Sequence, residues 1–338
     1  MKKFFLVLIA AFAVLVAWQF LFRRPAGSVV VYCAHDAVFA DAVLQRFARE
    51  TGIRVITMFD SEATKSLGLV ERLRQEQSRP QADVFWNNEQ LGTMDLANAG
   101  VLDEYQGSGW NRIPERFRDP QGRWTGFAAR LRVELDHQSN PDAARDPAKG
   151  AMAKPLFGTT LTHYCALWST FGGDAVKSWH ADLRAKGLRE VDGNGLSAKL
   201  VGEGAVQWGL TDTDDAFGLL DEGKPVRMIP ARVQLIGSGK PVPADAPTIV
   251  IPNTIAVIKG GPHPREARQL ADWLLCAQVE EQLANGPARQ IPLGPVDDTK
   301  IPAAVRDLRP AAAQGIDLTT IFPARAPVLA WLKSQYGL

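Results

Sequence analysis

The sequence is poor in cysteine, and the three cysteines that it contains lie far apart. Cys33, Cys165 and Cys276 form no Cys-x-x-Cys pair, which excludes a zinc-finger or thioredoxin-like motif. Because their number is odd, at least one thiol is expected to stay free in an oxidising compartment. Cys165 and Cys276 lie in apolar helical stretches and are expected to be buried as small hydrophobic side chains.

The chain also lacks the short motifs that announce common catalytic sites. It contains no Gly-x-Ser-x-Gly, no His-Glu-x-x-His and no paired Cys-His signature. A phosphate-binding Gly-x-x-x-x-Gly-Lys-Ser/Thr loop is absent as well, so no ATPase activity is expected of this chain. His163 is close to Thr160 and Cys165, but its helical context favours packing or capping. We therefore predict that the chain is not an enzyme, with a secreted hydrolase as the less favoured alternative.

A field of one charge sign is missing too. The formal net charge is +1, and it falls to −3 without the four basic residues of the N-terminal segment, Lys2, Lys3, Arg23 and Arg24. Charges of both signs are scattered along the chain. A basic surface for nucleic acid is therefore not expected.

Long apolar runs are absent except at the N-terminus, where residues 4–22 form one between basic residues. Such a run is typical of a secretory signal, but it is also about long enough to cross a bilayer. Residues 1–27 are therefore predicted to be either a signal peptide or an uncleaved membrane anchor. Both alternatives place the remaining chain in the periplasm or another extracytoplasmic space.

What the chain does contain, in its first third, is an alternation of apolar strands and amphipathic helices. Residues 28–32, 53–59 and 82–86 read as strands, and helical spacing follows each of them. This order predicts a parallel, doubly wound α/β lobe, whose ligands lie outside the carboxyl ends of the strands. Polar residues stand at all three ends, and we predict the following as ligand-binding: His35, Asp36, Glu62, Asn88 and Glu89.

Two further extended segments, residues 126–135 and 248–259, read as strands that leave this lobe and return to it. About 310 residues follow the N-terminal segment, which suits two lobes better than one core. We predict an α/β fold of two lobes, each a mostly parallel sheet flanked by helices, joined by a two-strand hinge. Lobe 1 would comprise residues 28–127 and 255–338, and lobe 2 residues 128–254.

Lobe 2 offers two candidate sites. Thr159 and Thr160 stand at the predicted start of a helix, where backbone N–H groups can bind an anion, although a threonine there can simply cap its helix. Asp212, Asp214 and Asp215 follow a predicted strand over residues 205–210. Three clustered acids suit a cationic ligand, and a solvated helix cap is the alternative.

Several segments, taken in order, resemble one protein family. They are VVVYCAHD, ADVFWNNEQLG with AGVLDEY, GRWTGFAARLRV, PLFGTTLTHYCALW and IPNTIAVIKGGPHPREARQLADWLL. Together they resemble the periplasmic ferric-ion-binding-like branch of type 2 solute-binding proteins, over about residues 30–293. The resemblance implies a subunit of an ABC importer that captures a small polar ligand by hinge closure and delivers it to a permease driven by a separate ATPase. The ligand could be a metal ion such as Fe(III), or an organic solute such as a phosphonate or phosphosugar. The resemblance implies no required cofactor, and it implies that the protein is a monomer.

The resemblance also implies a ligand set. Iron-holding members use a His or acid after the first strand, a Glu after the third, and two adjacent tyrosines in lobe 2. His35 (or Asp36) and Glu89 match the first two, whereas Asp214 and Asp215 stand where the tyrosines should be. The residues leave two alternatives: a metal held by His35, Glu89, Asp214 and Asp215, or a zwitterion with its ammonium on the three aspartates and its anion on the two threonines. A membrane-tethered sensory ectodomain is the alternative function, and it would need a separate signalling partner.

Overall fold

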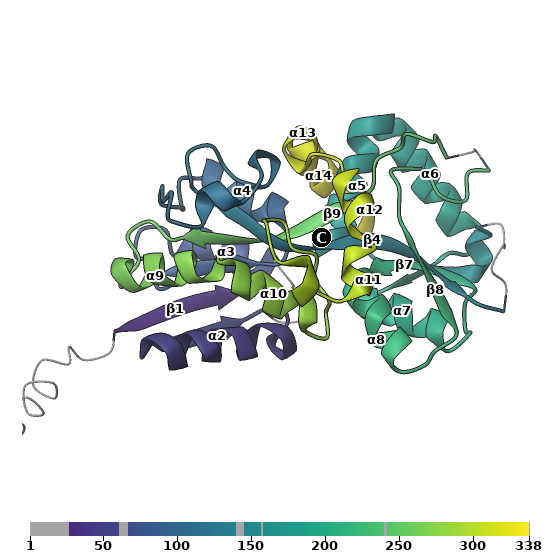
Figure 1. The fold of residues 1–338 in the computed structure, drawn as a ribbon. Coiled ribbons are helices and arrows are strands. Elements are labelled where there is room, and N and C mark those ends of the chain that lie inside the picture. Colours follow the sequence, from purple (N-terminus) through teal and green to yellow (C-terminus); the bar gives the residue numbers. More distant parts are fainter. Residues whose placement is uncertain (1–26, 61–66, 140–144, 157, 240–241, 338) are drawn as a thin grey trace, which may run out of the picture.

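The computed structural model describes residues 27–60, 67–139, 145–156, 158–239 and 242–337. It shows two lobes joined by long strands (Figure 1). The predicted N-terminal signal or anchor and the candidate ligand residue Glu62 lie outside the described residues. Among the residues that are described, no helix combines the length and apolar character needed to cross a membrane.

Lobe 1 contains the three strands and three helices expected in the first third of the chain. They are β1 (Ser28–Cys33), α2 (Ala37–Thr51), β2 (Arg54–Phe59), α3 (Leu67–Gln75), β3 (Val84–Asn87) and α4 (Gln90–Asn98). Strand β1 pairs in parallel with both β2 and β3. The carboxyl ends of all three strands therefore lie at one edge, as the sequence predicts.

Two long strands connect the lobes (Figure 1). They are β4 (Thr125–His137) and β9 (Val250–Val257), which pair antiparallel from Thr125↔Ile255 to Leu131↔Val250. Strand β9 also pairs with β3, and β4 continues beside β7 of lobe 2. A single sheet results, with the order β2-β1-β3-β9-β4-β7-β5-β6 and with β8 paired to β4. The predicted two-strand connection is confirmed.

Lobe 2 repeats the α/β pattern around the far half of β4. Its elements are β5 (Gly150–Ala153), α5 (Gly158–Phe171), α6 (Gly173–Ala185), β6 (Arg189–Val191), α7 (Asn194–Gly202), β7 (Trp208–Asp212), α8 (Thr213–Asp221) and β8 (Val226–Pro230). Strand β5 pairs in parallel with β6 and β7, whereas β4 pairs antiparallel with β7 and β8. Each lobe thus holds three mutually parallel strands joined to the antiparallel connecting strands.

Three short 3₁₀ helices lie in the first half of the chain: η1 (Trp110–Arg112), η2 (Glu115–Phe117) and η3 (Pro147–Lys149).

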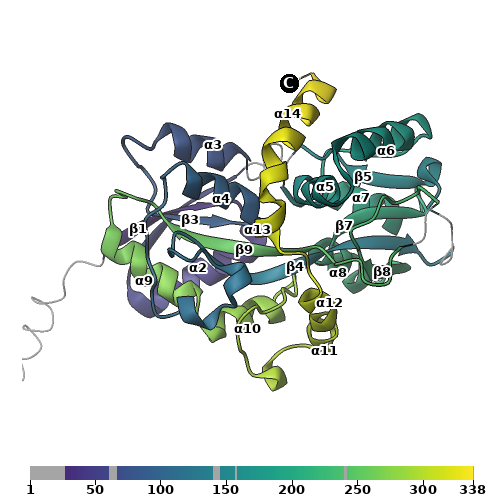
Figure 2. The ribbon, with the colours of Figure 1, turned by 90° about the horizontal axis from the view of Figure 1, so that it is seen from above.

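The C-terminal region contacts both lobes. Its elements are α9 (Pro264–Leu274), α10 (Ala277–Asn285), η4 (Asp298–Lys300), α11 (Ala303–Arg306), α12 (Arg309–Ala313), α13 (Leu318–Ile321), η5 (Phe322–Ala324) and α14 (Arg325–Tyr336). Helix α14 packs against α5 (Figure 2), and its Arg325 forms an ion pair with Asp95 of α4. The lobe boundaries stay a prediction. They assign α14 to lobe 1, although this helix packs against α5 of lobe 2.

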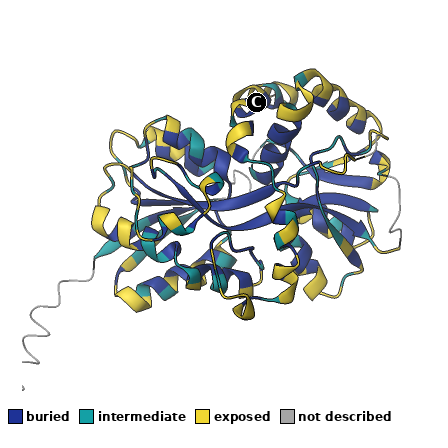
Figure 3. Ribbon diagram, turned by 45° about the horizontal axis from the view of Figure 1, so that its top comes forward, coloured by how far each residue is buried: buried dark blue, intermediate teal, exposed yellow. Residues whose placement is uncertain are grey.

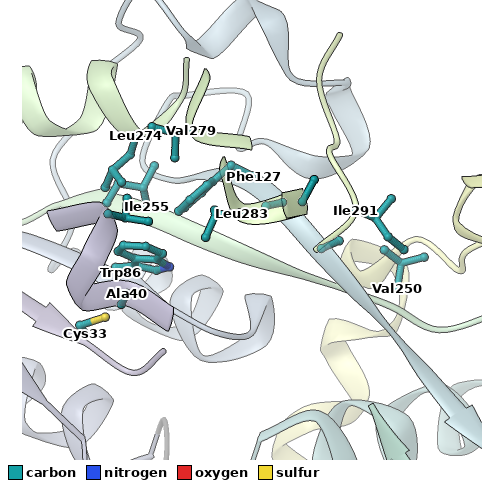
Figure 4. Packing of buried hydrophobic residues seen from close by; sticks show 14 of the residues in the cluster. Cys33, Ala40, Trp86, Phe127, Val250, Ile255, Leu274, Val279, Leu283 and Ile291 are labelled. Carbon is teal, nitrogen blue, oxygen red and sulfur yellow. The ribbon is translucent and has the colours of Figure 1, made fainter. Parts of the chain in front are cut away.

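The largest apolar cluster runs from lobe 1 along the connecting strands, and the sheet is its most buried part (Figure 3). Trp86, Phe127 and Ile255 lie in it, and Leu274 and Leu283 cover them from α9 and α10 (Figure 4). Each such side chain contributes about 1.5–3 kcal/mol when fully buried. The three cysteines form no disulfide; Cys33 and Cys165 are buried and Cys276 is half-buried.

The connecting strand β4 contains an irregularity where it leaves lobe 1. Its register with β9 shifts between Phe127 and Ala129, and Ala128 between them has a φ of 41°. The buried carboxylate of Glu280 accepts a hydrogen bond of 2.7 Å from the Ala128 N–H. A helix of lobe 1 therefore holds the start of the connection through one charged side chain.

Candidate functional site

A cavity of ≈ 130 Å³ lies between the lobes, next to the connecting strands. It is formed by the ends of β1 and β3, by β4, and by the first residues of α5, α7 and α8. The lining residues are Asp36, Asn88, Arg130, Ala153, Lys154, Gly158, Thr159, Thr160, Asp192, Gly193, Asn194, Gly195, Asp212, Asp214 and Asp215. Polar side chains from both lobes therefore face one small space.

Most of the ligand residues predicted from the sequence meet in this cavity. They are Asp36, Asn88, Thr159, Thr160, Asp212, Asp214 and Asp215. They come together because parallel strands place their carboxyl ends at one edge of the sheet. Their role in binding stays a prediction.

His35 is buried and is not among the residues that line the cavity. Gln290 Nε2 donates to His35 Nε2 at 2.9 Å in the tautomer whose proton is on Nδ1. The imidazole is buried and packs against Trp86 and Phe39, with ring centroids 5.6 and 5.5 Å away. These contacts are those of a core histidine.

Glu89 caps a helix in this structure. Its Oε2 accepts from the Leu91 N–H and its Oε1 from the Gly92 N–H, both at 2.7 Å, at the start of α4. Burial raises the pKa of Glu89, and Arg325 opposes this effect.

The structure thus separates the four residues of the metal hypothesis. Asp214 and Asp215 line the cavity, whereas His35 and Glu89 do not. In the described part of the chain, no group of three or more His, Cys, Asp or Glu side chains is placed to hold a metal ion.

Two arginines of β4 are central to the site, and they were not among the residues predicted from the sequence. Arg130 is only 4% exposed; its Nη2 donates to the Asn88 carbonyl at 2.9 Å, and its Nε lies 3.4 Å from Asp212 Oδ2 and 3.9 Å from Asp214 Oδ2. Arg132 is fully buried and donates from Nη1 to Asp212 Oδ1 at 2.8 Å. Residues two apart on a strand share a face. Two arginines at that spacing inside an apolar strand were the signal available in the sequence.

Asp212 is the hub of this charge network. Its Oδ2 accepts from Thr159 Oγ1 at 2.7 Å and from Asn194 Nδ2 at 3.1 Å, in addition to its contacts with the two arginines. Burial opposes ionisation of Asp212, but Arg132 and Arg130 outweigh it and hold the pKa of Asp212 below its usual value. The carboxylate is therefore charged at neutral pH.

His163, on the second turn of α5, borders the same network. It is 4% exposed, and burial together with the nearby Arg132 lowers its pKa to about 3. The imidazole is neutral in the folded protein at neutral pH. An unfolded chain protonates it near its ordinary pKa of about 6.5.

This difference predicts a loss of stability in mild acid. Because the folded pKa is lower than the unfolded one, the stabilisation is complete above about pH 6.5 and declines as the pH falls toward 3. His163 alone should cost about 2 kcal/mol of unfolding free energy at pH 5. Urea unfolding of the wild type and of His163→Gln, measured from pH 7.5 to 5, should show a flatter pH dependence in the variant. His137→Gln is the control, since that ring contacts Ser139 near the surface; equal slopes in all three proteins would contradict the prediction.

No family model matches the chain, but relatives and solved structures do. A curated relative is iron uptake protein A1 of Synechocystis, 22% identical over 259 residues that cover 71% of this chain and 68% of the relative. Iron-bound HitA from Pseudomonas aeruginosa has a TM-score of 0.75 at 20% identity, and the match covers 92% of this chain and all of HitA. The periplasmic binding protein AfuA from Actinobacillus pleuropneumoniae, solved with fructose 6-phosphate bound, has a TM-score of 0.72 at 15% identity, over 92% of this chain and 99% of AfuA.

The chain has the two-lobed fold of periplasmic binding proteins. The predicted fold class is confirmed, as is the predicted resemblance to the ferric-ion-binding-like branch. The matched proteins are described as binding and uptake proteins rather than as enzymes. Iron is bound in one of these structures and a phosphosugar in another. The shared fold therefore does not determine which ligand is bound, and the residues of the cavity do.

Proposed function

We propose that the chain is the extracytoplasmic solute-binding subunit of an ABC importer and that it captures a small polar solute in the cavity between its lobes. The observation that carries this proposal is the cavity lining, in which Asp36 and Asn88 of lobe 1 face Thr159, Asp214 and Asp215 of lobe 2. A ligand that contacts both groups holds the lobes together across the connecting strands.

The mechanism is a population shift without a chemical step. Separation of the lobes about β4 and β9 would open the cavity to solvent, and a bound solute would favour the closed arrangement. The solute, whether a metal ion or an organic molecule, is cargo and leaves the protein unchanged. Arg130 and Asp212, the latter held by Arg132, supply a preformed polar lining, so little reorganisation is needed when the solute arrives.

Delivery requires partners that this chain does not supply. The closed protein would dock as a monomer on a membrane permease, and a separate ATPase subunit would drive transport. The N-terminal segment would either direct secretion and be removed, or keep the protein at the membrane surface. Both alternatives place the binding lobes outside the cytoplasm, where the solute is met.

Ligand-dependent stabilisation tests this proposal. Full-length protein, purified in mild detergent and stripped of metal, is unfolded thermally with Fe(III), divalent metals, phosphonates, phosphosugars and amino compounds in separate samples. The nine tryptophans report unfolding through their fluorescence. A true ligand at about 100 times its Kd should add about 2.7 kcal/mol to the free energy of unfolding. Small-angle X-ray scattering of the same samples should show a more compact particle with that ligand, and a failure of every compound in both measurements would rule the proposal out.

A further inference from the structure

We propose that the captured solute is a small zwitterion, with its acidic group on Arg130 and its ammonium group on the carboxylates of Asp36, Asp214 and Asp215. This inference rests on the proposed function and adds the chemical class of the ligand. It follows from how the charges in the cavity are already paired within the protein.

Asp212 has a carboxylate that is largely engaged by groups of the protein itself. An ionised carboxylate has about four sites for hydrogen-bond donors. Arg132, Thr159 and Asn194 donate to Asp212, and Arg130 Nε lies 3.4 Å from its Oδ2. Three hydrogen bonds and the ion pair with Arg130 therefore engage most of this carboxylate and leave it little capacity for a ligand. Its role is to position Arg130, which revises the role expected for it from the sequence.

Arg130, in contrast, has a guanidinium that keeps unused donors in the cavity. Of its five N–H groups, one donates a hydrogen bond, from Nη2 to Asn88. The buried Nε forms no hydrogen bond but is ion-paired with Asp212 at 3.4 Å and Asp214 at 3.9 Å, whereas Nη1 donates to none of the described residues, although the side chain is only 4% exposed. A buried guanidinium that lines a cavity is suited to bind a carboxylate or phosphonate through two parallel bonds.

Besides Asp212, and besides Asp192, which forms an ion pair with Lys154 of the lining at 2.9 Å, three aspartates line the same space. Asp36 stands between β1 and α2, directly before the helix, and Asp214 and Asp215 come from the first turn of α8. These carboxylates disfavour a ligand that carries only negative charge, while Arg130 disfavours a bare cation. An ammonium group has three donors and can contact carboxylates of both lobes at once. A small molecule with both charges therefore satisfies Arg130 and the aspartates together, and it fits a cavity of ≈ 130 Å³.

Matched probes test the inference by calorimetry on the metal-stripped, full-length protein. 2-Aminoethylphosphonate and β-alanine carry both charges, ethylphosphonate and propionate carry only the acid, and ethylamine carries only the ammonium group. We expect at least one of the two zwitterions to bind, and each of its single-charge analogues to bind at least about 30-fold more weakly. Fe(III) and Zn²⁺ alone serve as the metal probes and are expected not to bind.

Two variants test the two ends of the ligand separately, and a third serves as a control. Asp214→Asn should weaken binding of the zwitterion by about 30-fold or more and leave ethylphosphonate binding no weaker. Asp212→Asn acts through Arg130, so it should weaken the zwitterion and ethylphosphonate by the same factor, which a purely structural effect on the aspartate end would not do. Asp174→Asn, at a fully exposed aspartate of α6, is the matched control and should bind like the wild type.

The outcomes distinguish this inference from the proposed function. Tight binding of a metal ion alone, or of ethylphosphonate as well as of the zwitterion, would overturn the inference and leave the transport function standing. The inference is overturned in the same way if the wider thermal screen finds only ligands without an ammonium group. Failure of every probe in both experiments would overturn the function itself. Zwitterion binding that is lost in Asp214→Asn and kept in Asp174→Asn supports both.

Discussion

Replacing Glu280 with alanine is expected to lower the free energy of unfolding by about 3–5 kcal/mol. Its Oε1 accepts from the Ala128 and Leu293 N–H groups at 2.7 and 2.8 Å, and its Oε2 from the Gly294 N–H at 3.1 Å. The guanidinium of Arg112 forms an ion pair with the same carboxylate. Alanine would leave three N–H groups without their acceptor, in a place where Glu280 is fully buried, and Arg112 without its ion-pair partner, although its guanidinium still donates to two backbone carbonyls. Urea unfolding followed by tryptophan fluorescence should show a lower midpoint at an unchanged slope.

The neighbouring residue provides the control. Glu281 on the same helix is half-buried, and its Oε2 lies 3.8 Å from Lys300 Nζ, an exposed side chain. Glu281→Ala should therefore cost less than about 1 kcal/mol. If the two alanine variants unfold at the same urea concentration, Glu280 does not hold the start of β4. A large difference would show that the connection between the lobes depends on this one carboxylate.

The architecture was largely predictable because strand and helix periods are local properties of the sequence. Short apolar runs and extended apolar segments predicted β1, β2 and both connecting strands within two residues of their bounds. Strand β7 begins at Trp208 rather than at Ala205, because the N–H groups of Ala205 and Val206 bond to the Leu200 carbonyl and close the end of α7. Strands β5 and β6 were not predicted, since each has at most four residues and neither shows a clear alternation.

The cavity was predictable only in part, because charge pairing is not local. Asp212 suggested a ligand residue, but its partner Arg132 is 80 positions away in the sequence. His35 likewise bonds to Gln290, 255 positions away. Glu89 is the exception, since an acid directly before a helix is a capping signal that is visible in the local sequence.

The tyrosines expected from the resemblance are also absent from the described residues that line the cavity. Asp214 and Asp215 do line the cavity, and they are the residues that stand where the resemblance would lead one to expect tyrosines. The four tyrosines of this chain are engaged in other contacts, with Glu76, Asp272, His180 and Glu190. The fold therefore does not identify the ligand, which has to be inferred from the charges of the cavity.

Replacing Arg132 with methionine is expected to cost about 3–5 kcal/mol, the second large effect. Methionine fills much of the same volume, so the main change is the loss of a positive charge beside Asp212. The carboxylate would stay buried at 3% exposure with one guanidinium fewer. Urea unfolding at pH 7 should detect the loss, and Arg265→Met, at a largely exposed arginine, should not reproduce it.

The pH dependence of the Arg132→Met deficit identifies its cause. In the wild type the folded pKa of Asp212 is lowered, so its stabilisation is present above the unfolded pKa of about 3.9 and is lost only as the pH falls through the folded value. Without Arg132, burial is less opposed and the pKa of Asp212 should rise. The difference between variant and wild type should then be largest at pH 7 and smaller at pH 5, where protonation begins to remove the buried charge. Adding Asp212→Asn to Arg132→Met should recover part of the loss at pH 7, because the double variant has no uncompensated carboxylate. A deficit that is independent of pH and unchanged in the double variant would mean that Arg132 stabilises lobe 2 by packing alone.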